Sequence, residues 1–137
     1  MGRRTSREVA VKLLYELEIQ KNCDCEKPDV KRQIEFKFLE EEISISDKAY
    51  VMGVVEGVLD NVDLLDCIIK KHSKGWKIER IPRIDLSILR LGVYEINFRF
   101  DIPFTVSINE AIELAKKYSG KDSGSFINGI LGKATER

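Results

Sequence analysis

Apolar side chains recur at three- and four-residue spacing along most of the chain, which is the period of a helix that buries one face. Ala10, Leu13, Leu14 and Leu17 set this pattern near the N-terminus. It returns over residues 46–61, 62–72, 82–100, 107–119 and 126–134, and a further helix is expected through residues 34–38. No segment shows the convincing two-residue alternation of a strand. The pattern therefore predicts a single all-α domain of about seven helices.

Short polar motifs mark where some of these helices should begin and end. Thr5 with Glu8, and Ser107 with Glu110, have the spacing of a capping box. In that motif each side chain bonds an unpaired amide of the first helical turn. Gly120 suits the end of the helix that starts at Ser107. We therefore expect one helix to begin at Thr5 and another at Ser107.

Composition agrees with a folded domain and narrows the range of functions. Of 137 residues, 43% are hydrophobic and 34% are charged, a balance typical of globular chains. No apolar run approaches the roughly 18 residues that a membrane-spanning helix needs. Three cysteines without a disulfide framework indicate reduced thiols, and hence a cytoplasmic location.

Residue types needed for catalysis or metal binding are sparse. The sole histidine, His72, follows two lysines and has no obvious nucleophile beside it. Cys23 and Cys25 are separated by one residue rather than two, and no second ligand pair follows. No glycine-rich phosphate-binding motif occurs. We therefore expect no enzyme activity, no metal site and no cofactor.

Charge is unevenly distributed, although 23 basic and 23 acidic residues cancel over the whole chain. Arg3, Arg4 and Arg7 lie at or just before the first helix, and Arg7, Lys12 and Tyr15 are expected on its polar side. Guanidinium groups pair with phosphate, and a nearby aromatic ring can stack on an unpaired base. The alternative is a basic N-terminus without a ligand. Because cations oppose the dipole at a helix N-terminus, the pattern favours an anionic ligand.

A second polar cluster lies at the start of the last helix. In the string KDSGSFINGIL, Lys121, Ser123 and Ser125 stand beside Phe126, and Gly124 permits close backbone approach. A helix N-terminus offers free amides to an anion. The pattern alone is equally consistent with Phe126 as a core residue.

Four strings, read in order, resemble the NusB family of transcription antitermination factors: RRTSREVAVKLLYELE, IDLSILRLGVYEI, DIPFTVSINEAIELAKKY and DSGSFINGILGK. The resemblance implies an all-α fold of two small helical bundles packed together. The N-terminal half would span about residues 1–75 and the C-terminal half about residues 76–137. No cofactor and no catalysis are implied.

The resemblance also implies a function and partners. NusB proteins bind the single-stranded boxA element of nascent ribosomal RNA as a heterodimer with NusE, a ribosomal protein. That complex joins RNA polymerase with other Nus factors and suppresses premature termination. The chain is therefore expected to be an RNA-binding adaptor, and the resemblance leaves both a monomer and a homodimer open.

Carried over residue by residue, the resemblance assigns an RNA footprint. It places the family's RNA-binding positions at Arg3, Arg4, Arg7, Lys12, Tyr15, Asp122, Ser125 and Phe126. Many relatives carry a basic residue where Ser125 stands, so Lys121 is expected to supply the missing cation. Asp85 and Asp122 are candidates for contact with the protein partner, and Asp85 could equally cap its own helix.

Two alternatives belong to different functional classes. A similar domain forms the N-terminal part of ribosomal RNA cytosine methyltransferases, but the few residues after Lys133 leave no room for a methyl-donor-binding domain. The other alternative is a helical module that binds only proteins. Salt dependence separates it from the adaptor, since each phosphate contact on a single strand adds roughly 0.7 to the salt slope of log affinity.

Overall fold

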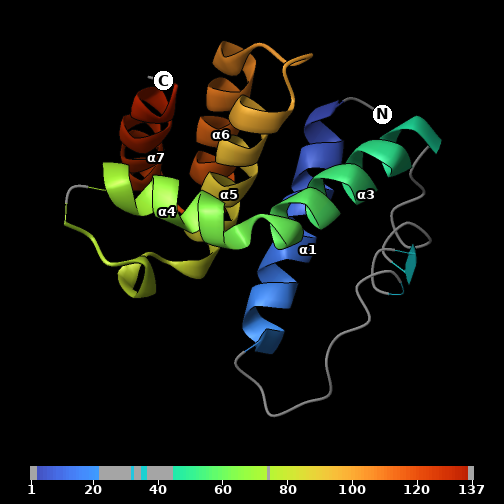
Figure 1. Ribbon diagram of the computed structural model, residues 1–137, viewed down its shortest axis with the longest axis horizontal. Helices are drawn as coiled ribbons and strands as arrows, with labels where there is room; N and C mark the ends of the chain where they lie inside the picture. The colour runs from blue at the N-terminus through green and yellow to red at the C-terminus, as the bar shows by residue number, and fades with distance from the viewer. Residues whose placement is uncertain (1–2, 22–31, 33–34, 37–44, 74, 136–137) are drawn as a thin grey trace.

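The computed structural model describes residues 3–21, 32, 35–36, 45–73 and 75–135 (Figure 1). Its elements are α1 (Arg3–Lys21), α3 (Ile45–Asp60), α4 (Val62–His72), the 3-10 turn η1 (Ile78–Arg80), α5 (Arg83–Phe98), α6 (Phe104–Tyr118) and α7 (Lys121–Ala134). The described residues contain no strand, so the all-α prediction is confirmed. The helix expected through residues 34–38 lies mostly outside the described ranges.

Helix α5 is at the centre of the fold. It contacts α1 and α3 as well as α4, α6 and α7, and its apolar residues join the core that these helices share (Figure 1). Two glycines let helices approach closely here. A Cβ at Gly92 would come within 2.9 Å of Leu131 on α7, and a Cβ at Gly57 on α3 would collide with the ring of Tyr94. The absence of these side chains sets the packing distance of α5 from both neighbours.

Helix α4 packs mainly against helices from the C-terminal part of the chain. The division near residue 75 assigns it to the N-terminal half, yet α4 packs chiefly against α5 and α7. The division of the chain into two halves stays a prediction. Among the helices in the described ranges, none is long and apolar enough to cross a membrane.

Both capping-box predictions are wrong. Helix α1 begins two residues before Thr5, and α6 begins at Phe104, so all four motif residues lie within their helices. The side chains of Glu8, Ser107 and Glu110 bond other helices instead of their own first turn. Glu8 accepts hydrogen bonds from α6, Glu110 accepts them from α1, and Ser107 donates one to α5. Polar residues whose spacing resembles a capping box therefore make hydrogen bonds between helices in this fold.

Candidate nucleic-acid interface

Helix α1 presents an exposed polar stripe that includes three of the predicted RNA-binding residues. Arg4 is exposed, Lys12 is half-buried, and the ring of Tyr15 is 38% exposed. The side chains of Lys12 and Tyr15 make no hydrogen bond or ion pair within the described part of the chain. Arg3 begins the helix, but its side chain lies outside the described structure. The predicted RNA-binding residues of α1 that are accessible are thus one arginine, one lysine and one aromatic ring.

Arg4 is exposed but paired. Its Nε lies 2.8 Å from Oε2 of Glu110 and its Nη2 lies 3.0 Å from Oε1, which is a bidentate contact. The hydrogen bond from Arg4 lowers the pKa of the Glu110 carboxyl from its ordinary value. Because the Arg4 side chain remains 62% exposed, part of its guanidinium faces solvent while the pair is formed.

Arg7 is not on the polar side of α1, and this part of the prediction is wrong. The residue is 4% exposed, and its guanidinium lies 2.9–3.2 Å from both carboxylate oxygens of Glu95 on α5. Tyr50 of α3 (2.7 Å) and Ser107 of α6 (3.1 Å) donate to the same carboxylate. One buried carboxylate thus joins four helices. Because its partner and the core enclose it, Arg7 has no free face for a phosphate.

Helices α1 and α6 run in the same direction (Figure 1), and hydrogen bonds link them at successive turns. Arg4 contacts Glu110, and one turn later Glu8 accepts hydrogen bonds from Lys117 (2.8 Å) and Tyr118 (3.2 Å). The next turn of α1 carries Lys12, while α6 ends at Tyr118 and α7 begins at residue 121. The two predicted surfaces therefore lie at the same level of the fold.

The start of α7 is an exposed polar surface. Gly120 precedes it with φ +147°, a backbone conformation that suits glycine. Lys121, Asp122 and Ser125 are all exposed, and none of their side chains makes a hydrogen bond or ion pair within the described residues. Asp122 lies in the first turn, where its negative charge complements the helix dipole. The side chains that sequence assigned to RNA or partner contact are thus accessible here.

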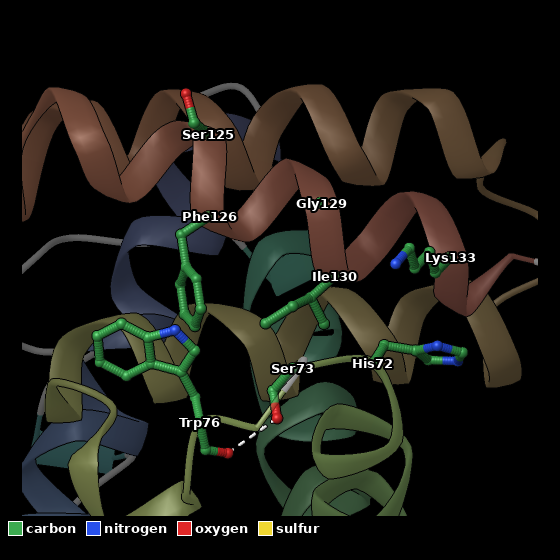
Figure 2. A pocket seen from close by; sticks show the side chains of 8 residues that line it. All are labelled: His72, Ser73, Trp76, Ser125, Phe126, Gly129, Ile130 and Lys133. Carbon is green, nitrogen blue, oxygen red and sulfur yellow. Dashed lines mark hydrogen bonds between the residues drawn. The ribbon is translucent and has the colours of Figure 1, made fainter.

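Phe126 lies between the core and the surface. Its ring is partly buried against the core and meets the indole of Trp76 edge to face, with the ring centroids 5.7 Å apart. Figure 2 shows the ring pointing from α7 toward Trp76, while the Ser125 side chain points away from it. The two rings border a hollow of about 220 Å³. Phe126 therefore lines an open hollow, and part of its ring is available to a ligand.

Asp85 does not face outward, so its expected contact with a partner is not supported by its position. It is 3% exposed, and the hydroxyl of Ser123 donates to its Oδ2 at 3.0 Å. Within the described residues, its Oδ1 is buried without a hydrogen-bond partner and no side chain caps α5. Asp85 thus links the first turn of α5 to the first turn of α7.

Sequence reasoning missed the aromatic residue nearest to Phe126. Trp76 is not among the candidate residues of the sequence analysis, yet it is 52% exposed in the segment between α4 and α5. Its neighbours Lys77 and Arg80 are exposed as well. A lone tryptophan in a stretch rich in lysine and arginine is a signal for nucleic-acid contact that the sequence contained.

The structure adds no metal centre to this surface. Among the described residues, no three His, Cys, Asp or Glu side chains gather where they could hold a metal ion. Cys67 is exposed as a free thiol, whereas Cys23 and Cys25 lie outside the described ranges.

Comparison with known proteins identifies the family of this chain. The model of the NusB family matches residues 4–136. The chain belongs to the NusB family. It is 52% identical over 136 residues to the transcription antitermination protein NusB of Ruminiclostridium cellulolyticum, a match that covers 99% of this chain and 90% of the relative. The NusB protein of Acetivibrio thermocellus is 54% identical with the same coverage. Antitermination is regulatory rather than catalytic, which confirms the prediction that the chain is not an enzyme.

Solved structures agree with the family assignment. NusB from T. maritima superposes with a TM-score of 0.89 at 31% identity, covering 100% of this chain and 92% of the other. A chain from a crystal structure of the antitermination factors NusB and NusE in complex with dsRNA gives a TM-score of 0.85 at 24% identity. That match covers 98% of this chain and 96% of the other, and it supports the fold alone.

Proposed function

We propose that this NusB-family chain is a cytoplasmic RNA-binding adaptor that recognises a single-stranded boxA element together with the ribosomal protein NusE. The RNA-bound pair would then join RNA polymerase in an antitermination complex. The observation that carries the proposal is the pair of accessible surfaces on α1 and at the start of α7, with side-chain hydrogen bonds that join α1 to α6, the helix that precedes α7.

The chemistry of these surfaces fits single-stranded RNA. Arg4, Lys12 and Lys121 supply cations for phosphate, and Tyr15 and Phe126 supply rings for unstacked bases. Phosphate contacts contribute affinity and position, whereas contacts to exposed bases contribute sequence preference. Arg7 has no part in this footprint because Glu95 holds it in the core.

NusE is the proposed protein partner for two reasons. A family member has been crystallised with NusE and dsRNA. In addition, Asp122 and Ser125 are exposed acceptor and donor groups at the start of α7, beside the proposed RNA path.

Fluorescence anisotropy with a labelled boxA-type RNA tests the proposal. It should be measured with and without NusE at two salt concentrations. We expect weak, salt-sensitive binding that tightens when NusE is added, because coupling between two ligands is reciprocal. Absence of RNA binding in both conditions, from a folded protein, would favour a helical module that binds only proteins.

Phe126→Ala sharpens this test. If the ring stacks on a base, RNA binding should weaken by about 1–3 kcal/mol. Thermal unfolding of the same variant is the control, because the ring also packs against the core. A large loss of stability with unchanged RNA affinity would assign Phe126 to the core alone.

A further inference from the structure

Trp76 separates two hollows on the surface of the protein. On one side, its indole meets Phe126 at the hollow of about 220 Å³, which His72 and Lys133 line at its other end (Figure 2). On the other side, Trp76 borders a second hollow of about 410 Å³ with Lys77 and Arg80. An indole that is 52% exposed therefore stands between an aromatic neighbour and two cations.

The segment that carries Trp76 is held in place. The buried hydroxyl of Ser73 lies 3.1 Å from the carbonyl oxygen of Lys70 and 2.9 Å from that of Trp76. The amide of Trp76 donates to the carbonyl of Ser73 at 3.2 Å. Gly75 has φ +89°, which allows the tight turn between them. The exposed indole is thus pre-positioned, which lowers the entropy lost when a ligand binds.

The charge around Trp76 is strongly positive. Lys70 and Lys71 at the end of α4, and Lys77 and Arg80 after it, are exposed, and Glu79 is the acidic residue among them. The side chains of these four cations form no ion pair within the described part of the chain. Positive charge concentrated around an exposed aromatic ring is complementary to a polyanion whose bases can unstack.

We propose that RNA bound at Phe126 continues across Trp76, where one base stacks on the indole and adjacent phosphates contact Lys77 and Arg80. The segment between α4 and α5 would then be a second part of the RNA interface, in addition to α1 and the start of α7. The inference rests on the proposed function. It adds a defined base position and a direction for the strand, from α7 toward the end of α4.

Two features favour RNA over a protein at this surface. The cations flank the ring on the side of the larger hollow, whereas a protein-binding patch typically has an apolar centre depleted of charge. The smaller hollow is also continuous with Phe126, which already belongs to the proposed RNA footprint. A strand that stacks on Phe126 would therefore meet Trp76 next.

The chain contains one tryptophan, so its intrinsic fluorescence reports on this position alone. The experiment titrates the full chain with boxA-type RNA and records RNA anisotropy and tryptophan emission together. We expect the emission to be quenched with the same midpoint as the anisotropy rise, because a stacked base contacts the indole directly. An RNA shortened from the end that reaches Trp76 should still bind but quench less.

Variants at the site add an independent readout. Trp76→Ala should weaken RNA binding by roughly 5- to 150-fold, the value of one base–aromatic stack, and Trp76→Phe should recover part of the loss. Combined Lys77→Ala and Arg80→Ala should reduce the salt slope of log affinity by about 1.4, from two phosphate contacts on a single strand. Phe104→Ala is the matched control, because Phe104 is 53% exposed at the start of α6. It should leave RNA affinity unchanged.

Distinct results overturn the inference and the function on which it rests. An anisotropy rise without tryptophan quenching, or with an unchanged Trp76→Ala affinity, would place the RNA elsewhere and leave the adaptor function intact. Emission that responds to NusE but not to RNA would assign the surface to a protein and likewise overturn the inference. No anisotropy rise at all would contradict the proposed function itself.

Discussion

Arg4 and Arg7 lie one turn apart on the same helix, and their surroundings differ completely. Arg4 makes a bidentate contact with Glu110 and remains largely in solvent. Arg7 makes a bidentate contact with Glu95 inside a cluster that also includes Tyr50 and Ser107. The same residue type thus has a surface role in one case and a structural role in the other.

The difference follows from what each pair would lose on separation. Arg4 can leave its pair at lower cost than Arg7, since water solvates most of its side chain and salt screens its exposed charge. A buried pair cannot open in this way, because removal of one partner leaves a charge without solvent or counterion. Arg4 can therefore exchange Glu110 for an RNA phosphate, whereas Arg7 is committed to Glu95.

Arg7→Ala should have the largest effect on stability. It leaves the buried carboxylate of Glu95 without its cation, and loss of one partner of such a pair costs about 3–5 kcal/mol. Urea unfolding followed by circular dichroism measures the change. The double variant Arg7→Ala with Glu95→Gln should recover part of the loss, because it removes the uncompensated charge. An unfolding midpoint unchanged in Arg7→Ala would contradict the structural role.

Tyr50→Phe should have an intermediate effect on the same cluster. The change removes the hydroxyl that donates to Glu95 at 2.7 Å but keeps the buried ring. A hydrogen bond to a charged group contributes roughly 1.5–3 kcal/mol, so the unfolding free energy should fall by that amount. RNA affinity measured by anisotropy should not change, since Tyr50 is buried away from the proposed interface. A selective loss of RNA binding would count against this separation.

Arg4→Ala should leave the thermal midpoint almost unchanged but should weaken RNA binding. The exposed pair with Glu110 adds little to folding, so the thermal midpoint should stay close to that of the wild type. Lys48→Ala is the matched control, because Lys48 forms a comparable surface pair with Glu35 at 2.9 Å on α3. The control should alter neither the melting midpoint nor the RNA affinity. A clear drop in the midpoint for Arg4→Ala would show that the pair is structural.

The smallest expected effect is a pH dependence of stability that comes from the Arg4–Glu110 pair. The pKa of Glu110 is lowered in the folded protein by the hydrogen bond from Arg4, from an ordinary value of 4.5. Its contribution to stability is therefore complete above that ordinary value and is lost as pH falls through the lower folded pKa. Urea midpoints of the wild type and Glu110→Gln should differ near neutral pH and converge in acid. A difference that persists at low pH would exclude this origin.

Helix positions could be predicted because they follow from local periodicity. Residues such as Leu13 and Leu17 are buried as their spacing indicated, and α5 is the central helix of the fold. The NusB resemblance correctly placed this pattern in an all-α family. Local sequence thus determines which face of each helix becomes the core.

The partners of polar residues could not be predicted in the same way. Glu8 and Glu110 have the spacing of capping residues, yet each bonds a residue more than a hundred positions away. Arg7 lies in an arginine-rich segment but faces Glu95, which is 88 positions distant. Such contacts depend on how helices pack, and no local pattern encodes that geometry. The basic stretch around Trp76 is visible in the sequence, but the exposure of its indole depends on the same packing.

The most direct test is a salt titration of boxA-type RNA binding by the wild type, Arg4→Ala and Lys48→Ala, with melting curves of all three proteins. If Arg4 exchanges Glu110 for a phosphate, the slope of log affinity against log salt should fall by about 0.7 in Arg4→Ala alone, without a change in its melting temperature. Equal slopes for all three proteins, with RNA still bound, would contradict the assignment of Arg4 to the RNA interface.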